Sequence, residues 1–295
     1  MKPRHVVALV AINVLWGLAY TVAKHALAET PSIVLAFARF ALATLLMLPW
    51  LLHRGAPQHL RPPTKGHPAL IGLCGFCLSY LLLYVGISLT TATETAILVN
   101  LEAIFTALLG RLLLAERLHA RRGVGLALAF AGAMFLLRPE GNGHAAWPLA
   151  RTLGNLCIVA SVALEALATI LSRHLRRTYG AMELLARAVG WGALLLLLPA
   201  AAQWMALGRP LAWANPVNAA EVTYLAGGCT VVAYLMWYRV LARAEAGVAA
   251  AFIYLQPLVG VAAGVTLLHE PLRASALAGA ALIGCGVLLA SRSAS

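Results

Sequence analysis

The chain contains an internal repeat, because residues 84–136 and residues 238–290 align at a constant offset without a gap. Both copies are almost wholly apolar, and they share a Leu-Leu-x-Glu-x-Leu junction between two apolar stretches. Identical residues fall at Tyr84/Tyr238, Ala96/Ala250, Leu101/Leu255, Gly110/Gly264, Leu113/Leu267, Leu114/Leu268, Glu116/Glu270, Leu118/Leu272, Gly125/Gly279 and Gly132/Gly286. The repeat predicts a fold that is built from two related halves.

The composition places the chain in lipid. It is 62% hydrophobic and 11% charged, with a mean hydropathy of +0.85, which leaves too little polar material to cover a soluble globule of 295 residues. A net charge of +12 could suggest nucleic acid as a partner. The Lys and Arg residues are scattered between apolar stretches, however, so we interpret them as topology signals and expect no nucleic-acid partner.

Ten membrane-spanning helices are predicted, since a hydrocarbon layer about 30 Å thick needs roughly 20 apolar residues per helix. The expected spans are residues 5–28, 32–52, 68–89, 93–114, 120–138, 149–173, 181–205, 221–242, 247–268 and 273–291. Turn-length connections between several of them predict antiparallel neighbours. The fold class is therefore an all-α polytopic membrane protein.

The two halves are predicted to be inverted with respect to each other. A loop from Pro139 to Pro148, which contains Gly141, Asn142 and Gly143, is the natural boundary. It divides the chain into one five-helix repeat over residues 1–143 and a second over residues 144–295. Because five is odd, the second repeat must enter the membrane from the side opposite the first.

The basic residues support this topology. With both termini in the cytoplasm, fourteen lie on the inner side: Lys2, Arg4, Arg54, Arg61, Lys65, Arg117, Arg121, Arg122, Arg173, Arg176, Arg177, Arg239, Arg243 and Arg292. Five lie on the outer side: Lys24, Arg138, Arg151, Arg209 and Arg273. This asymmetry follows the positive-inside rule. The absence of an N-x-Ser/Thr sequon fits a bacterial inner (plasma) membrane.

The first span imitates a signal peptide, with Lys2 and Arg4 ahead of an apolar run and small residues after it. It is long for such a segment, and it aligns with the sixth span, for example Leu15 with Leu164 and Lys24 with Arg173. We therefore expect it to be retained as a member of the repeat.

Three short motifs stand out in the apolar spans: the run Asn13-Val14-Leu15-Trp16-Gly17, the run Ala38-Arg39-Phe40 followed by Pro49, and Pro257 leading to Glu270-Pro271-Leu272. Together they resemble the drug/metabolite transporter superfamily, EamA type. The fourth span departs from the pattern, because it has no proline at the position that matches Pro257. The aromatic third and eighth spans are most similar to those of bacterial amino-acid exporters of the YddG kind. The resemblance implies a basket-like bundle that moves amino acids outward by alternating access.

Paired tyrosines are candidates for substrate contact. Tyr80 and Tyr84 match Tyr234 and Tyr238 in the repeat, and Trp237 lies beside the second pair. A tyrosine offers a flat apolar face and one hydroxyl, which suits a hydrophobic or aromatic substrate. The alternative interpretation is that these rings only pack or lie at the membrane interface.

The fourth and ninth spans contribute Asn100 and Glu102, which match Tyr254 and Gln256. A carboxylate near mid-span costs about 2.5 to 3.5 kcal/mol on insertion scales, so Glu102 should face a cavity or a partner. Three roles stay open for it: binding a substrate ammonium group, coupling to protons, or pairing with an arginine. Glu94, near the outer mouth, is expected to be solvated.

Four other residues complete the set of candidates. Glu165 lies at mid-span where the first span has Trp16, and it is expected to contact substrate or protons, or else to bond a neighbouring hydroxyl. Arg39 and Arg187 occupy equivalent places in the second and seventh spans. We expect them to pair helices, with binding of a substrate carboxylate as the alternative for Arg39. Arg187 should be neutralised by Glu183 four residues earlier.

Other chemistries find little support. The five cysteines, Cys74, Cys77, Cys157, Cys229 and Cys285, all lie in predicted spans, where a thiol acts as a small hydrophobe. No His-Glu-x-x-His, Gly-x-Ser-x-Gly or P-loop motif occurs. We therefore expect no enzyme activity, no metal and no cofactor.

The sequence thus predicts a secondary transporter that exports amino acids, in particular hydrophobic or aromatic ones, and related small metabolites. Its partners would be that substrate and membrane lipid, and a monomer and a homodimer are both compatible. An exporter of lipophilic cations is the first alternative. A sugar-phosphate or nucleotide-sugar transporter is less favoured, because it would need several converging basic residues, and an intramembrane enzyme is least favoured.

Overall fold

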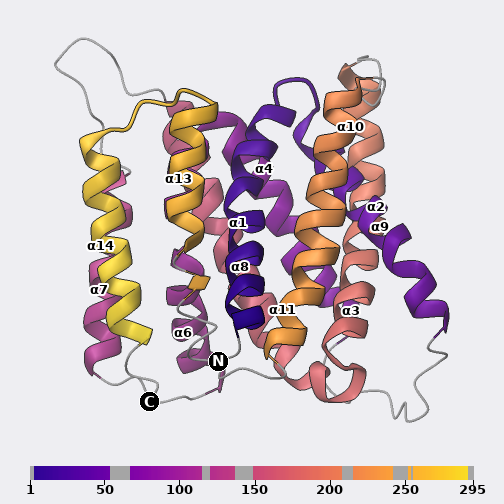
Figure 1. Cartoon of the computed structure of the whole chain (residues 1–295), viewed down its shortest axis with the longest axis horizontal. Coiled ribbons are helices and arrows are strands. Elements are labelled where there is room, and N and C mark those ends of the chain that lie inside the picture. Colours follow the sequence, from indigo (N-terminus) through magenta and orange to yellow (C-terminus); the bar gives the residue numbers. More distant parts are fainter. Residues whose placement is uncertain are drawn as a thin grey trace.

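The computed structural model describes residues 3–53, 67–114, 120–136, 149–207, 215–241, 252–253 and 255–291. Every regular element within those ranges is a helix (Figure 1). The helices are α1 (Pro3–Ala26), α2 (Ser32–His53), α3 (Pro68–Gly72), η1 (Leu73–Leu78), α4 (Ser79–Leu89), α5 (Ala92–Leu98), α6 (Leu101–Leu114), α7 (Ala120–Leu136), α8 (Leu149–Tyr179), α9 (Ala181–Leu207), α10 (Pro216–Thr223), η3 (Tyr224–Val232), α11 (Ala233–Leu241), α13 (Leu255–Leu267) and α14 (Ala274–Ser291).

These helices form the ten predicted spans. Among the described residues, seven continuous helical stretches are long and apolar enough to cross a membrane, and three shorter apolar helices complete the set. Most boundaries among the described residues agree with the prediction to within about two residues, and two differ by more. The eighth span begins at Pro216 because the Asn215 side chain caps it by accepting from the Val217 N–H at 3.0 Å. The sixth span continues as helix to Tyr179 and stops before Gly180, whose φ is +72°.

Both ends of the chain lie at the same end of the bundle. In Figure 1, α1 begins and α14 finishes at the lower end. We call this the terminal end; α8 also ends there, and α9 begins there. The opposite end, where α1 ends and α8 begins, is called the distal end. This arrangement is the one that an even number of spans and an inverted second half require. The predicted boundary at residue 143 falls outside the described residues.

Close contacts between α7 and α14 display the symmetry of the repeat. A Cβ added to Gly132 would lie 2.8 Å from the Gly279 carbonyl oxygen, and one added to Gly286 would lie 2.5 Å from the Gly125 carbonyl oxygen. Gly132 aligns with Gly286, and Gly125 aligns with Gly279. The two contacts are therefore equivalent in the two repeats, as expected for elements related by a two-fold axis. Glycine is required there because the two backbones touch.

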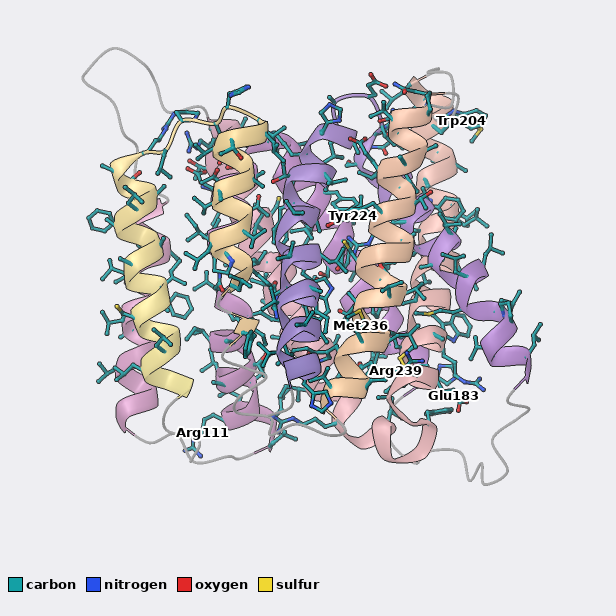
Figure 2. All side chains as sticks on the ribbon, viewed as in Figure 1. Arg111, Glu183, Trp204, Tyr224, Met236 and Arg239 are labelled. Carbon is teal, nitrogen blue, oxygen red and sulfur yellow. The ribbon has the colours of Figure 1, made fainter. Side chains whose placement is uncertain are left out.

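The outer surface is apolar along the helices and charged at their ends. Leu45, Leu112 and Leu198 are 63%, 68% and 78% exposed, which suits contact with lipid tails. Arg111 and Glu183 project from the terminal end (Figure 2). The bundle thus presents a hydrocarbon-facing belt with polar residues at its rim.

The third and eighth spans each contain a π-helical segment at the same place in the repeat. The η1 segment ends at Leu78 and η3 ends at Val232, and these two residues are aligned. The extra residue per turn changes which side chains face inward, and such segments are frequent at functional sites. Here η1 brings Phe76 to the interior of the bundle and η3 brings Thr230 to Arg39.

Candidate functional site

A cavity of about 140 Å³ lies inside the bundle. For scale, an engineered apolar cavity of about 150 Å³ holds a benzene molecule. Five spans supply its walls. The lining residues are Ile71, Gly75, Phe76, Tyr80, Glu102, Glu165, Ala168, Thr169, Ser172, Ala181, Leu184, Leu185, Ala188, Tyr234 and Tyr238.

The cavity extends from the middle of the bundle to its terminal end. Glu165 lies near the middle of α8, whereas Ser172 is two turns closer to the terminal end of the same helix. Ala181 is the first residue of α9. Because the lining reaches that residue, the cavity approaches the membrane surface on the side that carries the two chain ends.

Two carboxylates face this cavity, and both come from the predicted set. The Ser79 hydroxyl donates to Glu165 Oε1 at 3.1 Å, and Glu102 lines the cavity together with Thr169. Among the described residues, neither glutamate forms an ion pair, and no lysine or arginine lines the cavity. One role left open for Glu102 was pairing with an arginine, such as Arg39 or Arg187. No such ion pair forms among the described residues. The hydroxyl partner expected as an alternative for Glu165 is present.

Aromatic rings form another part of the wall. Three of the candidate tyrosines, Tyr80, Tyr234 and Tyr238, line the cavity together with Phe76. The Phe76 and Tyr80 rings are nearly parallel, with an interplanar angle of 6° and centroids 6.4 Å apart. The cavity therefore combines flat apolar surfaces with two carboxylates, which suits a cationic or zwitterionic solute with an apolar body.

Three of the predicted aromatic residues lie behind this wall. The Trp16 ring packs on Tyr234 at 5.3 Å and on Trp237 at 5.6 Å between centroids, and its Nε1 donates to the Cys229 carbonyl at 3.0 Å. Tyr84 is buried, with 1% of its surface exposed. The structure thus places Trp16, Trp237 and Tyr84 as supports of the lining residues.

The two arginines have different environments despite their equivalent positions. Arg39 is 5% exposed and donates from Nε to the Thr230 hydroxyl at 3.1 Å and from Nη1 to the Tyr84 hydroxyl at 3.0 Å. Arg187 pairs with Glu183 at 2.8 Å, as predicted, and its guanidinium lies over the Tyr179 ring. Arg39 joins three spans in the core, whereas Arg187 lies near the rim.

The remaining polar candidates do not line the cavity. Asn100, in the turn between α5 and α6, donates to the Ala96 and Ile97 carbonyls of α5 at 2.9 and 3.1 Å. Gln256 donates to Asn13 Oδ1 at 3.0 Å and so joins α13 to α1. Tyr254 lies outside the described residues.

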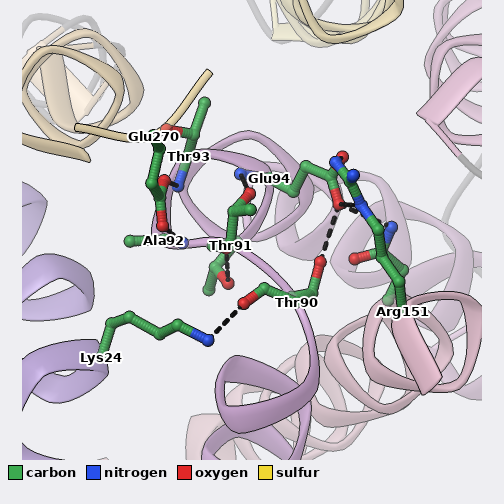
Figure 3. A network of polar contacts seen from close by, with 10 residues as sticks. Lys24, Thr90, Thr91, Ala92, Thr93, Glu94, Arg151 and Glu270 are labelled. Carbon is green, nitrogen blue, oxygen red and sulfur yellow. Dashed lines mark hydrogen bonds and ion pairs between the residues drawn. The ribbon is translucent and has the colours of Figure 1, made fainter. Parts of the chain in front are cut away.

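The distal end is held together by a buried polar network (Figure 3). Glu94 accepts from the Arg151 guanidinium, with Nε–Oε2 at 2.9 Å, and from the Thr90 hydroxyl at 2.7 Å. It is 2% exposed, so the expectation that it is solvated is wrong. An arginine on the neighbouring span compensates the charge and permits burial. Lys24 donates to the Thr90 carbonyl at 2.6 Å and ties α1 to the same network.

Glu270 joins the two halves at this end. Its carboxylate accepts from the backbone N–H groups of Ala92 and Thr93 at 2.7 and 2.8 Å, at the start of α5. These N–H groups have no partner within their own helix, so the contact is a helix cap. Glu270 therefore caps a helix of the first repeat, while its repeat counterpart Glu116 falls outside the described residues.

Sequence reasoning missed the hydroxyl groups of the site. Ser79, Thr169 and Ser172 lie at or next to the cavity, but none of them has a sequence signal that separates it from other serines and threonines. In membrane helices such side chains often bond their own backbone, as Thr44 does to the Phe40 carbonyl at 2.7 Å. The signals that pointed to this region were the mid-span carboxylate of Glu165 and its alignment with Trp16 in the repeat.

Comparison with known proteins agrees with this architecture. Residues 4–138 and 152–292 each match the model of the EamA-like transporter family. A relative in Archaeoglobus fulgidus, described as an uncharacterized transporter, is 30% identical over 85% of this chain and 84% of its own length. A relative in Escherichia coli, described as a probable amino-acid metabolite efflux pump, is 27% identical over 96% of this chain and 93% of its own.

Two further similarities extend over nearly the whole chain. A probable terminal-alkyne amino-acid exporter of Streptantibioticus cattleyicolor is 25% identical over 97% of this chain and 92% of its own. A crystal structure with 19% sequence identity superimposes with a TM-score of 0.63 and covers 100% of both chains, which shows the shared fold. With its two family matches and ten apolar helices, the chain is a multi-pass membrane protein that belongs to the EamA-like transporter family.

Proposed function

We propose that this protein exports amino acids with hydrophobic or aromatic side chains, and related small metabolites, by alternating access. The observation that carries the proposal is the cavity between the two halves, where Glu102 and Glu165 face Tyr80, Tyr234 and Tyr238. A carboxylate attracts the substrate ammonium group, and the tyrosine rings contact the side chain. The two repeats, residues 1–143 and 144–295, would act as the two moving units.

One-sided access supports the alternating mechanism. The cavity reaches the terminal end, whereas the contacts of Glu94, Arg151 and Glu270 join spans at the distal end. Opening the distal end requires these contacts to separate. The conformation described here is then the one that loads substrate from the side of the chain termini. The asymmetry of the basic residues supports placing that side in the cytoplasm of a bacterial cell, and the proposed direction of transport is then outward.

The names of two relatives point the same way. The Escherichia coli relative is described as a probable amino-acid metabolite efflux pump, and the Streptantibioticus cattleyicolor relative as a probable amino-acid exporter. Both align along almost the whole chain. The proposed substrate class therefore agrees with the descriptions of these two relatives.

Transport by purified protein in liposomes tests the proposal. Vesicles that contain the protein should take up labelled phenylalanine, leucine or related amino acids with saturation, and unlabelled amino acid should compete. Vesicles with the Glu102→Gln, Glu165→Gln double variant control for leakage. Absence of saturable transport across a broad panel of amino acids would contradict the proposal.

A second candidate is export of lipophilic amines. It is favoured by the presence of two carboxylates and no basic side chain among the described residues that line the cavity. A quaternary ammonium compound with an aromatic body would fit the same features. Competition decides between the candidates, because amino acids should displace a labelled amino acid much better than quaternary amines do if the first proposal holds.

A further inference from the structure

Arg39 carries a buried charge that has no acidic partner among the described residues. Its two hydrogen bonds go to the neutral hydroxyls of Thr230 and Tyr84, and no described carboxylate lies within 4.0 Å of it. A charged side chain in the middle of a membrane bundle is costly and generally faces a partner, a cavity or a ligand. Its repeat counterpart Arg187, by contrast, is neutralised by Glu183.

Tyr80 connects this arginine to the cavity. The Arg39 guanidinium carbon lies 4.7 Å from the centroid of the Tyr80 ring, and Tyr80 itself lines the cavity. The same ring stands edge-on to Phe40, with centroids 4.7 Å apart. Arg39 thus contacts a ring that lines the cavity, although it does not line the cavity itself.

The positive and negative groups therefore lie in different parts of the site. Glu102 and Glu165 face the cavity from α6 and α8, and Arg39 lies on α2 behind the ring of Tyr80. An α-amino acid carries its ammonium and carboxylate groups on adjacent carbons, so it is itself a short dipole. A guanidinium has five N–H donors in a planar fork that matches a carboxylate, and the two bonds to Thr230 and Tyr84 use only two of them.

We propose that Arg39 is a specificity-determining residue that recognises the carboxylate of a zwitterionic substrate beside Tyr80, opposite the Glu102 and Glu165 carboxylates that attract its ammonium group. The inference rests on the proposed transport of amino acids and names the chemical class that the site selects. It separates zwitterions from simple amines, because an amine has nothing to offer the guanidinium and leaves its charge uncompensated.

The test compares two ligands that differ only in the carboxylate. Binding of labelled phenylalanine to purified protein is measured in competition with phenylalanine and with phenethylamine, for the parent chain and for Arg39→Gln. In the parent, phenylalanine should compete at least about tenfold better than phenethylamine, because the amine has no carboxylate to form charge-assisted hydrogen bonds with Arg39. For Arg39→Gln, labelled phenethylamine serves as the reference ligand. The affinity of this variant for phenylalanine should fall to its affinity for phenethylamine or below, while its affinity for phenethylamine should equal that of the parent.

The ratio of the two affinities keeps the test independent of folding. If Arg39 had a purely structural role, Arg39→Gln would lower the affinity for both ligands by the same factor, and that result would overturn the inference. Arg187→Gln removes the same charge near the rim and should leave the ratio unchanged. Equal competition by both ligands in the parent chain would overturn the inference without any variant. If the parent bound neither ligand, the proposed function itself would fail.

Discussion

Glu94 on α5 and Arg151 on α8 form a buried ion pair across two spans that are distant in the sequence. Their side chains are 2% and 12% exposed, and Glu94 also accepts from Asn155 at 3.0 Å. The pair lies at the distal end, next to the Glu270 cap on the start of α5. It therefore contributes to the closure of the bundle on the side opposite the cavity mouth.

The Glu94–Arg151 pair should show strong energetic coupling. In a double-mutant cycle with Glu94→Gln and Arg151→Gln, we expect a coupling free energy of about 0.5 to 3 kcal/mol, because each single variant leaves a buried polar group unpaired. The free energy of unfolding is measured in mixed detergent. The exposed pair of Glu183 and Arg187 is the control, with an expected coupling of about 0.3 to 0.5 kcal/mol. Purely additive effects at Glu94 and Arg151 would contradict this account.

The two cavity carboxylates should be needed for transport and not for insertion. Glu102→Gln and Glu165→Gln keep the side-chain shape but remove the charge that attracts an ammonium group. Each should lower the initial transport rate in liposomes at subsaturating substrate by about tenfold or more, equivalent to about 1.4 kcal/mol. Glu183→Gln, near the rim, should stay within about twofold of the parent. Full activity in both cavity variants would refute the role assigned to them.

The glycine contacts between α7 and α14 should be sensitive to a single methyl group. Gly286→Ala places a Cβ against the Gly125 carbonyl and should destabilise the protein by about 1 to 3 kcal/mol through overpacking. Gly284 is the matched control, since a Cβ there meets nothing within 4 Å. Thermal unfolding in detergent compares the two. Equal midpoints for the two variants would show that the helices do not touch in this way.

Glu270 should stabilise the distal end through the cap of α5. Glu270→Ala leaves the Ala92 and Thr93 N–H groups unpaired in a buried place, at a cost of about 1 to 3 kcal/mol. Glu270→Gln retains one acceptor oxygen, so a smaller loss is expected. The midpoint of thermal unfolding ranks the three proteins. An unchanged midpoint in Glu270→Ala would remove the capping role.

Much of the fold follows from the sequence because a membrane imposes few options. Ten apolar stretches of the right length, with an odd number in each repeat, led to the inverted bundle that the helices form. The π-helical segments in the third and eighth spans were not predicted. They depend on packing against neighbouring helices, for example Gly192 of α9, where a Cβ would lie 2.5 Å from the Phe76 Cβ, and hydropathy contains no signal for such contacts.

The sequence predicted only part of the candidate site. Glu102 and Glu165 were found because a carboxylate at mid-span has few inert explanations, and Tyr80 and Tyr234 because the repeat pairs them. Asn100 and Gln256 illustrate the limit. Both are polar and deep, yet Asn100 bonds the end of α5 just before it and Gln256 bonds Asn13 on α1. Only three-dimensional contacts distinguish these uses from substrate binding.

Glu94 shows a related limit. Its position near the end of a span suggested solvation, and Arg151 was interpreted only as a topology signal. The two residues are 57 positions apart in the sequence, so their pairing depends on the packing of α5 against α8. Long-range pairs of this kind are invisible to periodicity and composition.

The most direct test fills the cavity. Ser172 lines it near the terminal end, and Ser172→Trp would place an indole in the path to Glu102 and Glu165. Leu198→Trp, on a lipid-facing position that is 78% exposed, adds the same side chain elsewhere. Binding of labelled phenylalanine to the purified proteins is measured alongside thermal unfolding. We predict that the parent and Leu198→Trp bind while a folded Ser172→Trp does not, and binding by Ser172→Trp with unchanged affinity would contradict the assignment of this cavity as the substrate site.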